Sequence, residues 1–204
     1  MEANRPEDLD LIAGLGNPGP EYKDTRHNVG FRVISRMSRE LGVRLRDGRF
    51  HSKHVRTKIR GKEIILLCPN TFMNLSGKSI KGCADYYGLK TENILIVHDD
   101  LDLPVGRIKI VKYAGSGGHK GVASIIDYLG GKEFPRIKIG IGRPRFGETT
   151  EEYVLSSFYE DQMKIMEKVI QMSAYACKLC VSGGVESAMN HINRKNYEDK
   201  EVQI

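Results

Sequence analysis

The chain has 204 residues and a mass of 23.0 kDa, with 40% hydrophobic and 28% charged residues, which is ordinary for a soluble globular protein. Its polar start, MEANRPEDLD, lacks the apolar core of a secretory signal, and no apolar run approaches the roughly 20 residues of a membrane span. Composition therefore argues against secretion and membrane insertion. We expect a cytoplasmic protein, and four cysteines suit that reducing compartment.

Hydrophobic periodicity predicts strands that alternate with helices along the chain. The predicted strands are residues 9–13, 93–97, 106–111 and 136–142, with a hairpin over residues 50–68. The predicted helices are residues 29–41, 76–87 with Ser76 as its cap, 122–129, 159–181 and a short helix that ends near residue 192. Alternation of this kind is typical of the α/β class, and the hairpin makes the sheet mixed.

The predicted architecture is one α/β domain, with a mixed, twisted β-sheet flanked by helices. At this length one domain is the expectation, and no internal repeat divides the chain. We place the domain at residues 9–195, between a flexible N-terminal tail of residues 1–8 and a C-terminal tail of residues 196–204.

The loop after the first predicted strand contains Gly14, Gly16 and Gly19, which match the dinucleotide fingerprint G-x-G-x-x-G. That fingerprint needs its third glycine in the first turn of a helix that holds a pyrophosphate. Here Pro18 and Pro20 flank the third glycine, and the next helical pattern starts some nine residues later. A nicotinamide- or flavin-dependent oxidoreductase is therefore a weak alternative.

Cys177 and Cys180 form a C-x-x-C pair, a pattern found in zinc and redox sites. The pair lies inside a long helical pattern, and the chain has no second C-x-x-C. We interpret the two cysteines as small apolar residues on a stripe that faces the core.

The positive charge is concentrated in two segments. Residues 32–62 contain eleven Lys and Arg against two acidic residues, and residues 107–145 contain nine against two. Residues 148–204 contain six against ten. Such a polarised distribution is typical of a protein with a polyanionic partner, although a solvated basic face would give the same counts.

Polar side chains collect in four predicted loops: Asn17 with His27, Asn74, His98 with Asp99, and His119 with Lys120. Histidine is the side chain best suited to general-base catalysis near neutral pH, and a buried carboxylate fixes its tautomer.

We therefore predict His27 as the base and Asp99 as its partner, in preference to Asp100 or Asp102, which continue into the loop. The run of three aspartates leaves Mg²⁺ binding as an alternative.

Six motifs carry a resemblance to a known family: GLGNPGPEY, TRHNVGF, TFMNLSGKS, VHDDLDLPVG, GSGGHKG and RIKIGIGRP. In this order and spacing they resemble the bacterial-type peptidyl-tRNA hydrolases, over residues 11–143. The resemblance implies a monomeric α/β enzyme with no metal and no cofactor. It implies cleavage of the ester that joins a peptide to the 3'-terminal ribose of tRNA, which recycles tRNA from prematurely released chains.

The resemblance also implies roles for single residues. His27 matches the catalytic base, Asp99 the carboxylate that orients it, and Asn17 the asparagine that holds the substrate or the attacking water. We expect substrate contacts from a set of residues around them: Tyr22, Phe72, Met73, Asn74, Gly118, His119 and Lys120. Lys120 departs from the family, which usually has an asparagine there; a lysine offers donors only.

A tRNA substrate explains the basic segments, because phosphate contacts supply affinity without sequence readout. We predict five residues for contact with its acceptor end: Arg107, Lys109, Lys112, Lys138 and Arg143. The alternative from another class is a non-catalytic RNA-binding relative; His27 and Asp99 favour the enzyme, and Lys120 favours the alternative.

Overall fold

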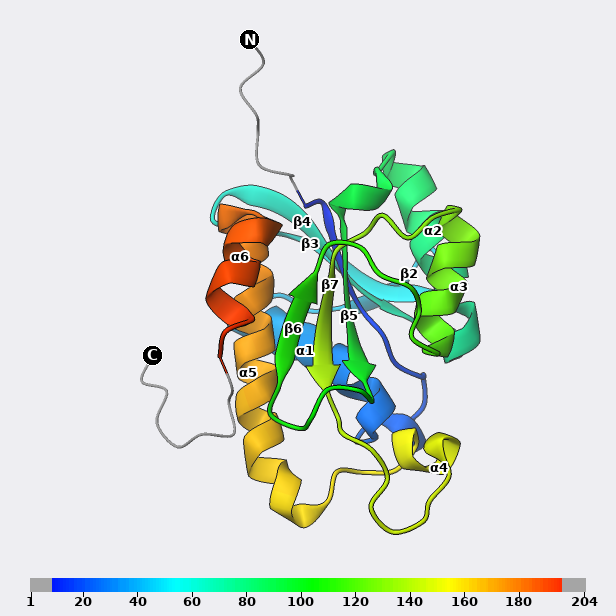
Figure 1. Cartoon of the computed structure of the whole chain (residues 1–204). Helices are drawn as coiled ribbons and strands as arrows, with labels where there is room; N and C mark the ends of the chain where they lie inside the picture. The colour runs from blue at the N-terminus through cyan, green and yellow to red at the C-terminus, as the bar shows by residue number, and fades with distance from the viewer. Residues whose placement is uncertain (1–8, 196–204) are drawn as a thin grey trace.

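The computed structural model describes residues 9–195 of the chain. Its framework is a seven-stranded sheet in the order β2-β3-β4-β1-β5-β7-β6 (Figure 1). The strands are β1 (Leu11–Gly14), β2 (Arg46–Gly48), β3 (Ser52–Ile59), β4 (Lys62–Pro69), β5 (Ile94–Asp100), β6 (Ile108–Val111) and β7 (Arg136–Gly140). The four central strands β4, β1, β5 and β7 are parallel, whereas β2, β3 and β6 run antiparallel to their neighbours.

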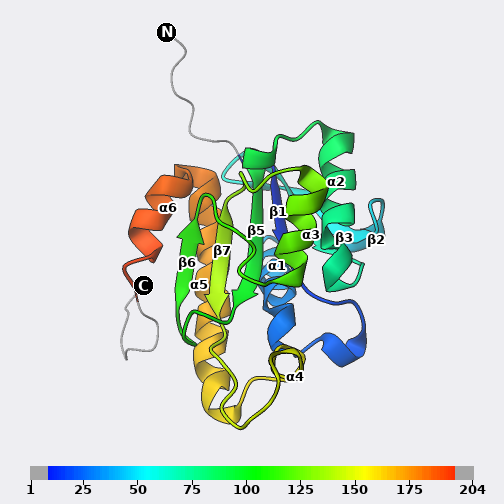
Figure 2. The ribbon, with the colours of Figure 1, turned by 45° about the vertical axis from the view of Figure 1, so that its right-hand side comes forward.

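Helices cover both faces of this sheet. The α-helices are α1 (Val29–Glu40), α2 (Ser76–Tyr87), α3 (Lys120–Leu129), α4 (Thr150–Val154), α5 (Glu160–Gly183) and α6 (Val185–Ile192). Short 3₁₀ turns lie at Pro20–Tyr22, Arg26–Asn28, Met73–Leu75 and Thr91–Asn93. Figures 1 and 2 show α5 and α6 on the side of the sheet away from α2 and α3. The predicted fold class, an α/β mixed sheet flanked by helices, is confirmed.

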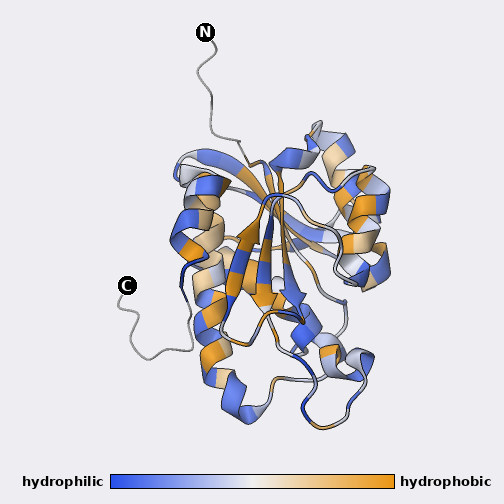
Figure 3. Ribbon diagram, in the orientation of Figure 1, coloured by the Kyte–Doolittle hydropathy of each residue, from blue (hydrophilic) through white to orange (hydrophobic). Residues whose placement is uncertain are grey.

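Side chains alternate in direction along each strand, so the sheet has one apolar layer on each of its two faces. In β5, Leu95 and Val97 belong to the cluster that includes α1 and α5, whereas Ile94 and Ile96 belong to the cluster that includes α2 and α3. Figure 3 shows the central strands as the most hydrophobic part of the fold. Because the parallel strands all end at the same edge of the sheet, the loops that follow them are brought together there.

Two glycines of the dinucleotide-like motif, Gly14 and Gly16, serve close packing between β1 and α1. A Cβ on Gly14 would collide with the backbone of Gly30, and one on Gly16 would lie 2.7 Å from the ring of Phe31. Helix α1 begins only at Val29, so Gly19 is not in its first turn. Gly14 and Gly16 are accounted for by helix–strand contact, and Gly19 does not open a helix that could hold a pyrophosphate, so the motif does not support an oxidoreductase.

The C-x-x-C pair lies in the core. Cys177 and Cys180 are free and buried in the layer between α5 and the sheet. Burial raises the pKa of the Cys180 thiol to about 12 and that of Cys177 well above its usual value. Both cysteines therefore act as small apolar residues, as interpreted from the sequence.

Some boundaries differ from the prediction. Strand β5 continues through Asp100, so His98 and Asp99 lie within the strand and not after it. Ser76 begins α2, and its hydroxyl donates to the carbonyl of Met73; because the chain already turns over Met73–Leu75, the helix needs no side-chain cap.

Strand β2 and helix α4 were not predicted. In the described part of the chain, no helix is both long and apolar enough to cross a membrane. The domain limits at residues 9 and 195 stay a prediction, and both predicted tails lie outside the described residues.

The contact between α1 and the sheet gives a stability prediction. A Cβ on Gly30 would lie 2.5 Å from the backbone nitrogen of Leu15, next to the carbonyl of Val97. These are backbone atoms that cannot move aside, so Gly30→Ala should lower the free energy of unfolding by about 1–3 kcal/mol.

Gly82→Ala, in helix α2, is the matched control, because its Cβ would meet Phe50 at an ordinary 3.6 Å. It should leave stability unchanged or raise it by up to about 1 kcal/mol. Urea denaturation of the two variants measures the difference; equal stabilities would contradict the close contact.

Candidate active site

A cavity of about 740 Å³ lies at the edge where the parallel strands end. Its walls come from the loops after β1, β4 and β5, the start of α3, and α4. The polar side chains that line it are Asn17, His27, Asn74, His98, Asp99, Asp100, Ser116, His119, Lys120, Thr150 and Glu151. All four polar loops identified in the sequence therefore contribute to one cavity.

The direction of side chains along β5 explains why His27 and Asp99 meet. Asp99 follows Leu95 and Val97 on the face that α1 covers, because alternate residues of a strand share a face. His27 lies in the turn just before α1. The end of the strand and the start of the helix thus bring the two side chains together across 72 residues of sequence.

The His27–Asp99 contact is short and buried. Nδ1 of His27 lies 3.0 Å from both carboxylate oxygens of Asp99. Burial opposes the charged imidazolium, but the charge of Asp99 and its hydrogen bond outweigh burial and raise the pKa of His27 above its usual value. With Nδ1 donating to the carboxylate, Nε2 is the nitrogen that can accept a proton on the cavity side.

A second histidine binds the same carboxylate. Nδ1 of His119 accepts hydrogen bonds from the backbone N–H groups of Gly121 and Val122, at 3.1 and 3.2 Å, and so caps α3. Since Nδ1 is an acceptor, the proton lies on Nε2, which donates to Asp99 Oδ1 at 3.0 Å. The helix cap therefore fixes the tautomer of His119.

Asp99 remains ionised in this arrangement. Burial by itself would raise the pKa of its carboxyl, but the two histidines hold that pKa well below its usual range. His98, on the opposite face of β5, packs its ring 4.8 Å from that of His119. Burial lowers the pKa of His98 to about 3, so its imidazole is neutral.

Three hydrogen bonds to two residues, Asn28 and Met73, hold Asn17 in place. Its backbone N–H donates to Oδ1 of Asn28 at 2.8 Å, and its carbonyl accepts from Nδ2 of Asn28 at 2.9 Å. Its own Oδ1 accepts from the backbone N–H of Met73 at 2.8 Å. Within the described residues the Nδ2 group of Asn17 has no protein partner, and it is the donor that this residue offers to the cavity.

Lys120 reaches across the mouth of the cavity. Its Nζ lies 3.1 Å from Oε1 of Glu151 in α4, and both side chains are mostly exposed. Sequence reasoning missed Glu151 and its helix. The capping box of Thr149 with Glu152 starts α4 in the structure, and the pattern T-x-x-E was the signal for it.

Sequence reasoning also missed Asn28, which fixes Asn17 and follows directly after His27 in the chain. The apolar walls of the cavity include Val154 and Leu155, again from the unpredicted α4 region. Asn28 lies within the motif TRHNVGF, but its role was not identified. No motif marked Val154 or Leu155, because their contribution depends on how α4 folds over the site.

Six of the seven residues predicted to contact the substrate line the cavity, and one does not. Phe72, Met73, Asn74, Gly118, His119 and Lys120 line the cavity with the predicted catalytic residues. Tyr22 is half-buried in the 3₁₀ turn of the preceding loop, where its carbonyl accepts from the hydroxyl of Thr25; it is not part of the cavity lining.

Two of the five residues predicted for tRNA contact have partners in the C-terminal part of the fold. The Arg107 guanidinium donates to the backbone carbonyls of Asn193 and Lys195, and Lys112 pairs with Glu186 at the other end of β6. Both therefore hold the C-terminal helix region against the edge strand.

The remaining three lie nearer the site. Lys138 binds Asp100 at 2.6 Å, Arg143 pairs with Asp102, and Lys109 projects from β6 opposite Lys138 in the strand register. Each of the three aspartates has a different partner. Asp99 contacts His27 and His119, Asp100 contacts Lys138, and Asp102 contacts Arg143. The arrangement does not bring them together as a Mg²⁺ site.

One group among the described residues has the composition of a metal site: His27, Asp99 and His119, whose ligand atoms lie within 4.8 Å of one another. Each histidine, however, directs an N–H at the carboxylate, and Nδ1 of His119 is occupied by backbone donors. A metal would need lone pairs where this network has protons. The donor set thus fits a hydrogen-bonded network better than a metal.

Fold and site together define an α/β protein in which a buried histidine–aspartate pair lines an open cavity, an arrangement that suits a hydrolase. Comparison with known proteins agrees. Residues 11–200 match the sequence model of the family described as peptidyl-tRNA hydrolase. The chain belongs to the peptidyl-tRNA hydrolase family.

Individual relatives cover nearly the whole chain. It is 41% identical over 185 residues to the peptidyl-tRNA hydrolase of Bacillus subtilis, covering 91% of this chain and 98% of that one. It is 42% identical over 183 residues to that of Caldanaerobacter subterraneus, with 90% and 98% covered. The crystal structure of the Acinetobacter baumannii enzyme superposes with a TM-score of 0.89 at 37% identity, covering 96% of this chain and all of that one.

Lys120 gives a prediction about pH. Its positive charge works to lower the pKa of His27, against the larger effect of Asp99. A base must be deprotonated, so activity falls as the pH drops through the pKa of His27. Replacing Lys120 with asparagine should therefore raise that pKa and move the acid limb of the kcat/KM profile to higher pH.

Lys90→Asn is the matched control, because Lys90 is exposed ahead of β5, at the opposite end of that strand from the site. Its pH profile should equal that of the wild type. An acid limb of Lys120→Asn that stays in place, or moves to lower pH, would contradict the assigned effect of the Lys120 charge on His27.

Proposed function

We propose that this protein hydrolyses the ester bond between a peptide and the 3'-terminal ribose of tRNA. The observation that carries the proposal is the network in which Asp99 binds His27 and His119 beside an open cavity. Membership of the peptidyl-tRNA hydrolase family supports the substrate.

The reaction starts with water bound near Nε2 of His27. That nitrogen takes a proton while the water oxygen attacks the ester carbonyl, and Asp99 stabilises the imidazolium that forms. The tetrahedral intermediate then loses the ribose oxygen, to which the imidazolium returns the proton. The products are the free peptide acid and tRNA with its ribose hydroxyl restored.

Asn17 is placed to assist at the reacting carbonyl. Its Nδ2 is an amide donor held by bonds to Asn28 and Met73, so it does not need to reorganise during the reaction. A fixed donor aimed at a developing oxyanion is worth about 3–4 kcal/mol. We assign Asn17 to this role or to holding the attacking water.

The peptide occupies the part of the cavity near Asn74. An amide side chain offers both a donor and an acceptor, which suits recognition of peptide backbone without regard to side chains. Phe72, 58% exposed, and the buried Met73 add apolar contact beside it. Gly118 leaves room for the substrate backbone, and Lys120 meets a phosphate or the ribose oxygen at the rim.

We propose that the reaction needs no metal and no cofactor, since His27 itself supplies the base. The partner is peptidyl-tRNA, and the protein acts in the cytoplasm, where translation provides that substrate. One chain holds every residue assigned to the site, so a monomer suffices. The alternative of a non-catalytic RNA-binding protein rested on Lys120, which pairs with Glu151 at the rim and leaves the His27–Asp99 contact intact.

The activity is tested by the release of labelled N-acetyl-aminoacyl groups from tRNA in the presence of EDTA. Wild-type protein should be active. Removing the base in His27→Ala, or misorienting it in Asp99→Asn, should lower kcat by about 10²–10⁴-fold.

His191→Ala, at an exposed histidine of α6, is the control and should retain wild-type kcat. Loss of wild-type activity in EDTA would point to a metal at the His27, Asp99 and His119 group. No wild-type activity in any buffer, with tRNA still bound, would favour the RNA-binding alternative.

A further inference from the structure

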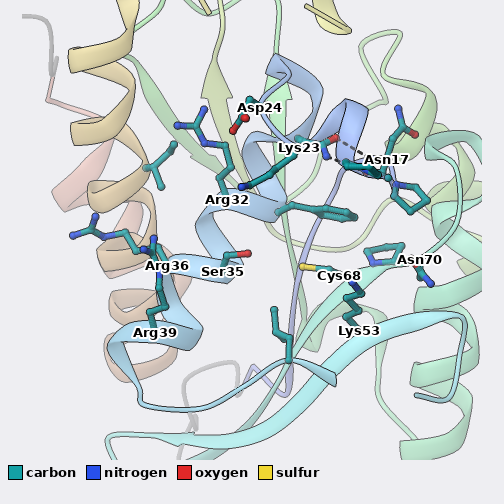
Figure 4. Close-up of a pocket in the computed structure, with 18 of the residues that line it drawn as sticks. Asn17, Lys23, Asp24, Arg32, Ser35, Arg36, Arg39, Lys53, Cys68 and Asn70 are labelled. Carbon is teal, nitrogen blue, oxygen red and sulfur yellow. Dashed lines mark hydrogen bonds between the residues drawn. The ribbon is translucent and has the colours of Figure 1, made fainter. Parts of the chain in front are cut away.

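A second cavity, of about 880 Å³, lies on the other side of the loop that carries Asn17. It is open to solvent and is lined by residues of α1, α5, the ends of β3 and β4, and residues 17–20 (Figure 4). We call it the α1–α5 cavity. Its apolar floor includes Phe31, Leu45 and Ile170.

Positive side chains dominate the rim of this cavity. Six are cationic, against two carboxylates, Asp24 and Glu167. The cations come from four segments of the chain: Lys23, Arg32, Arg36, Arg39, Lys53 and Lys164. Figure 4 shows Arg32, Arg36 and Arg39 following one another along α1, with Lys53 on the strand opposite.

Most of these cations form no salt bridge within the described part of the fold. Arg36 pairs with Glu40 at 2.7 Å, whereas the other five make no salt bridge with any described residue. Arg32 is half-buried; its guanidinium lies 5.8 Å from the ring centre of Phe158, and the charges of Asp24 and Glu167 act on it without a salt bridge. Unpaired positive charge around a concave surface favours an anionic ligand.

The cavity is adjacent to the candidate active site. Among the residues that the structure describes, Asn17 is the one that lines both cavities. A ligand that crosses Asn17 therefore extends from the reacting centre into the basic cavity. The substrate of the proposed reaction has an uncharged ester at its centre and a phosphodiester chain on one side of it.

We propose that the α1–α5 cavity binds backbone phosphates of a single-stranded segment of the tRNA substrate. This inference rests on the proposed function and adds a second RNA-binding subsite to it. It also assigns an RNA-binding role to part of the basic segment of residues 32–62, from which no residue lines the catalytic cavity.

The size and layout of the cavity favour RNA over other anions. Its volume is in the range of about 300–1,000 Å³ that suits a ligand of drug size, so a short single strand fits and a duplex does not. Arg32, Arg36 and Arg39 form a row about 10 Å long on one helix face, which matches a chain of repeated charges. Arginine forks and the ring of Phe31 suit phosphates and a stacked base.

The test measures the affinity of wild type and Arg39→Gln/Lys53→Gln for deacylated tRNA over a range of salt concentrations. These exposed residues lie on opposite walls of the cavity. We expect the double variant to bind about tenfold more weakly. The slope of log K against log salt should also become less steep by about 1.4, for two single-strand phosphates.

Lys90→Gln/Lys132→Gln is the matched control. It removes the same charge from exposed residues before β5 and β7, at the end of the sheet away from the site. Its affinity and salt slope should stay at the wild-type values. A loss in the control equal to that in the cavity variant, or no loss in either, would overturn the proposal.

A comparison of deacylated tRNA with peptide-carrying tRNA distinguishes RNA binding from peptide binding in this cavity. A defect seen only with tRNA that carries an acidic peptide, and not with deacylated tRNA, would assign the cavity to the peptide and overturn the proposal. The binding measurement needs no chemistry. Wild-type failure to hydrolyse N-acetyl-aminoacyl-tRNA would therefore refute the proposed function without changing what the salt slopes say about RNA binding.

Discussion

The site depends on one buried carboxylate. Asp99 is 2% exposed at the end of β5, and a charge in that position is costly unless it is fully hydrogen-bonded. His27 and His119 supply those bonds from the starts of α1 and α3, on opposite faces of the sheet. The need to satisfy Asp99 therefore fixes both histidines, and with them the nitrogen that faces the cavity. The two histidines have different tasks: the cap of α3 keeps His119 a donor, whereas Nε2 of His27 stays available.

The rest of the fold holds this network in position through the loop before α1. Arg26, adjacent to His27, is fully buried and donates to the hydroxyl of Ser156 at 2.6 Å, and its guanidinium lies 4.0 Å from the ring centre of Tyr153. The segment that follows α4 is thereby tied to the loop that carries the base. Asn28, on the other side of His27, fixes Asn17 by two hydrogen bonds. Three consecutive residues thus connect the base, its neighbouring asparagine and the wall of the cavity.

Local patterns in the sequence predicted most of the framework, because strongly apolar strands and amphipathic helices leave a clear periodicity. The helix at Val29 and the hairpin before Cys68 were found for that reason. The three residues of β2 are all exposed, so they carry no such periodicity. The choice of Asp99 over Asp100 could not be made from periodicity alone: it depends on how far β5 extends, and the structure carries that strand through Asp100. The Lys120–Glu151 pair and the α1–α5 cavity depend on contacts between distant segments, which no local pattern reports.

The most direct test of this account is the tautomeric state of the histidines, measured by ¹⁵N NMR at neutral pH on protein with labelled imidazoles. We expect neutral His27 to carry its proton on Nδ1 and His119 to carry its proton on Nε2. In Asp99→Asn the preference at His27 should weaken, while the α3 cap should hold His119 unchanged. A neutral His27 with its proton on Nε2, or a His119 with its proton on Nδ1, would contradict the network, because neither tautomer can donate to Asp99 in the observed geometry.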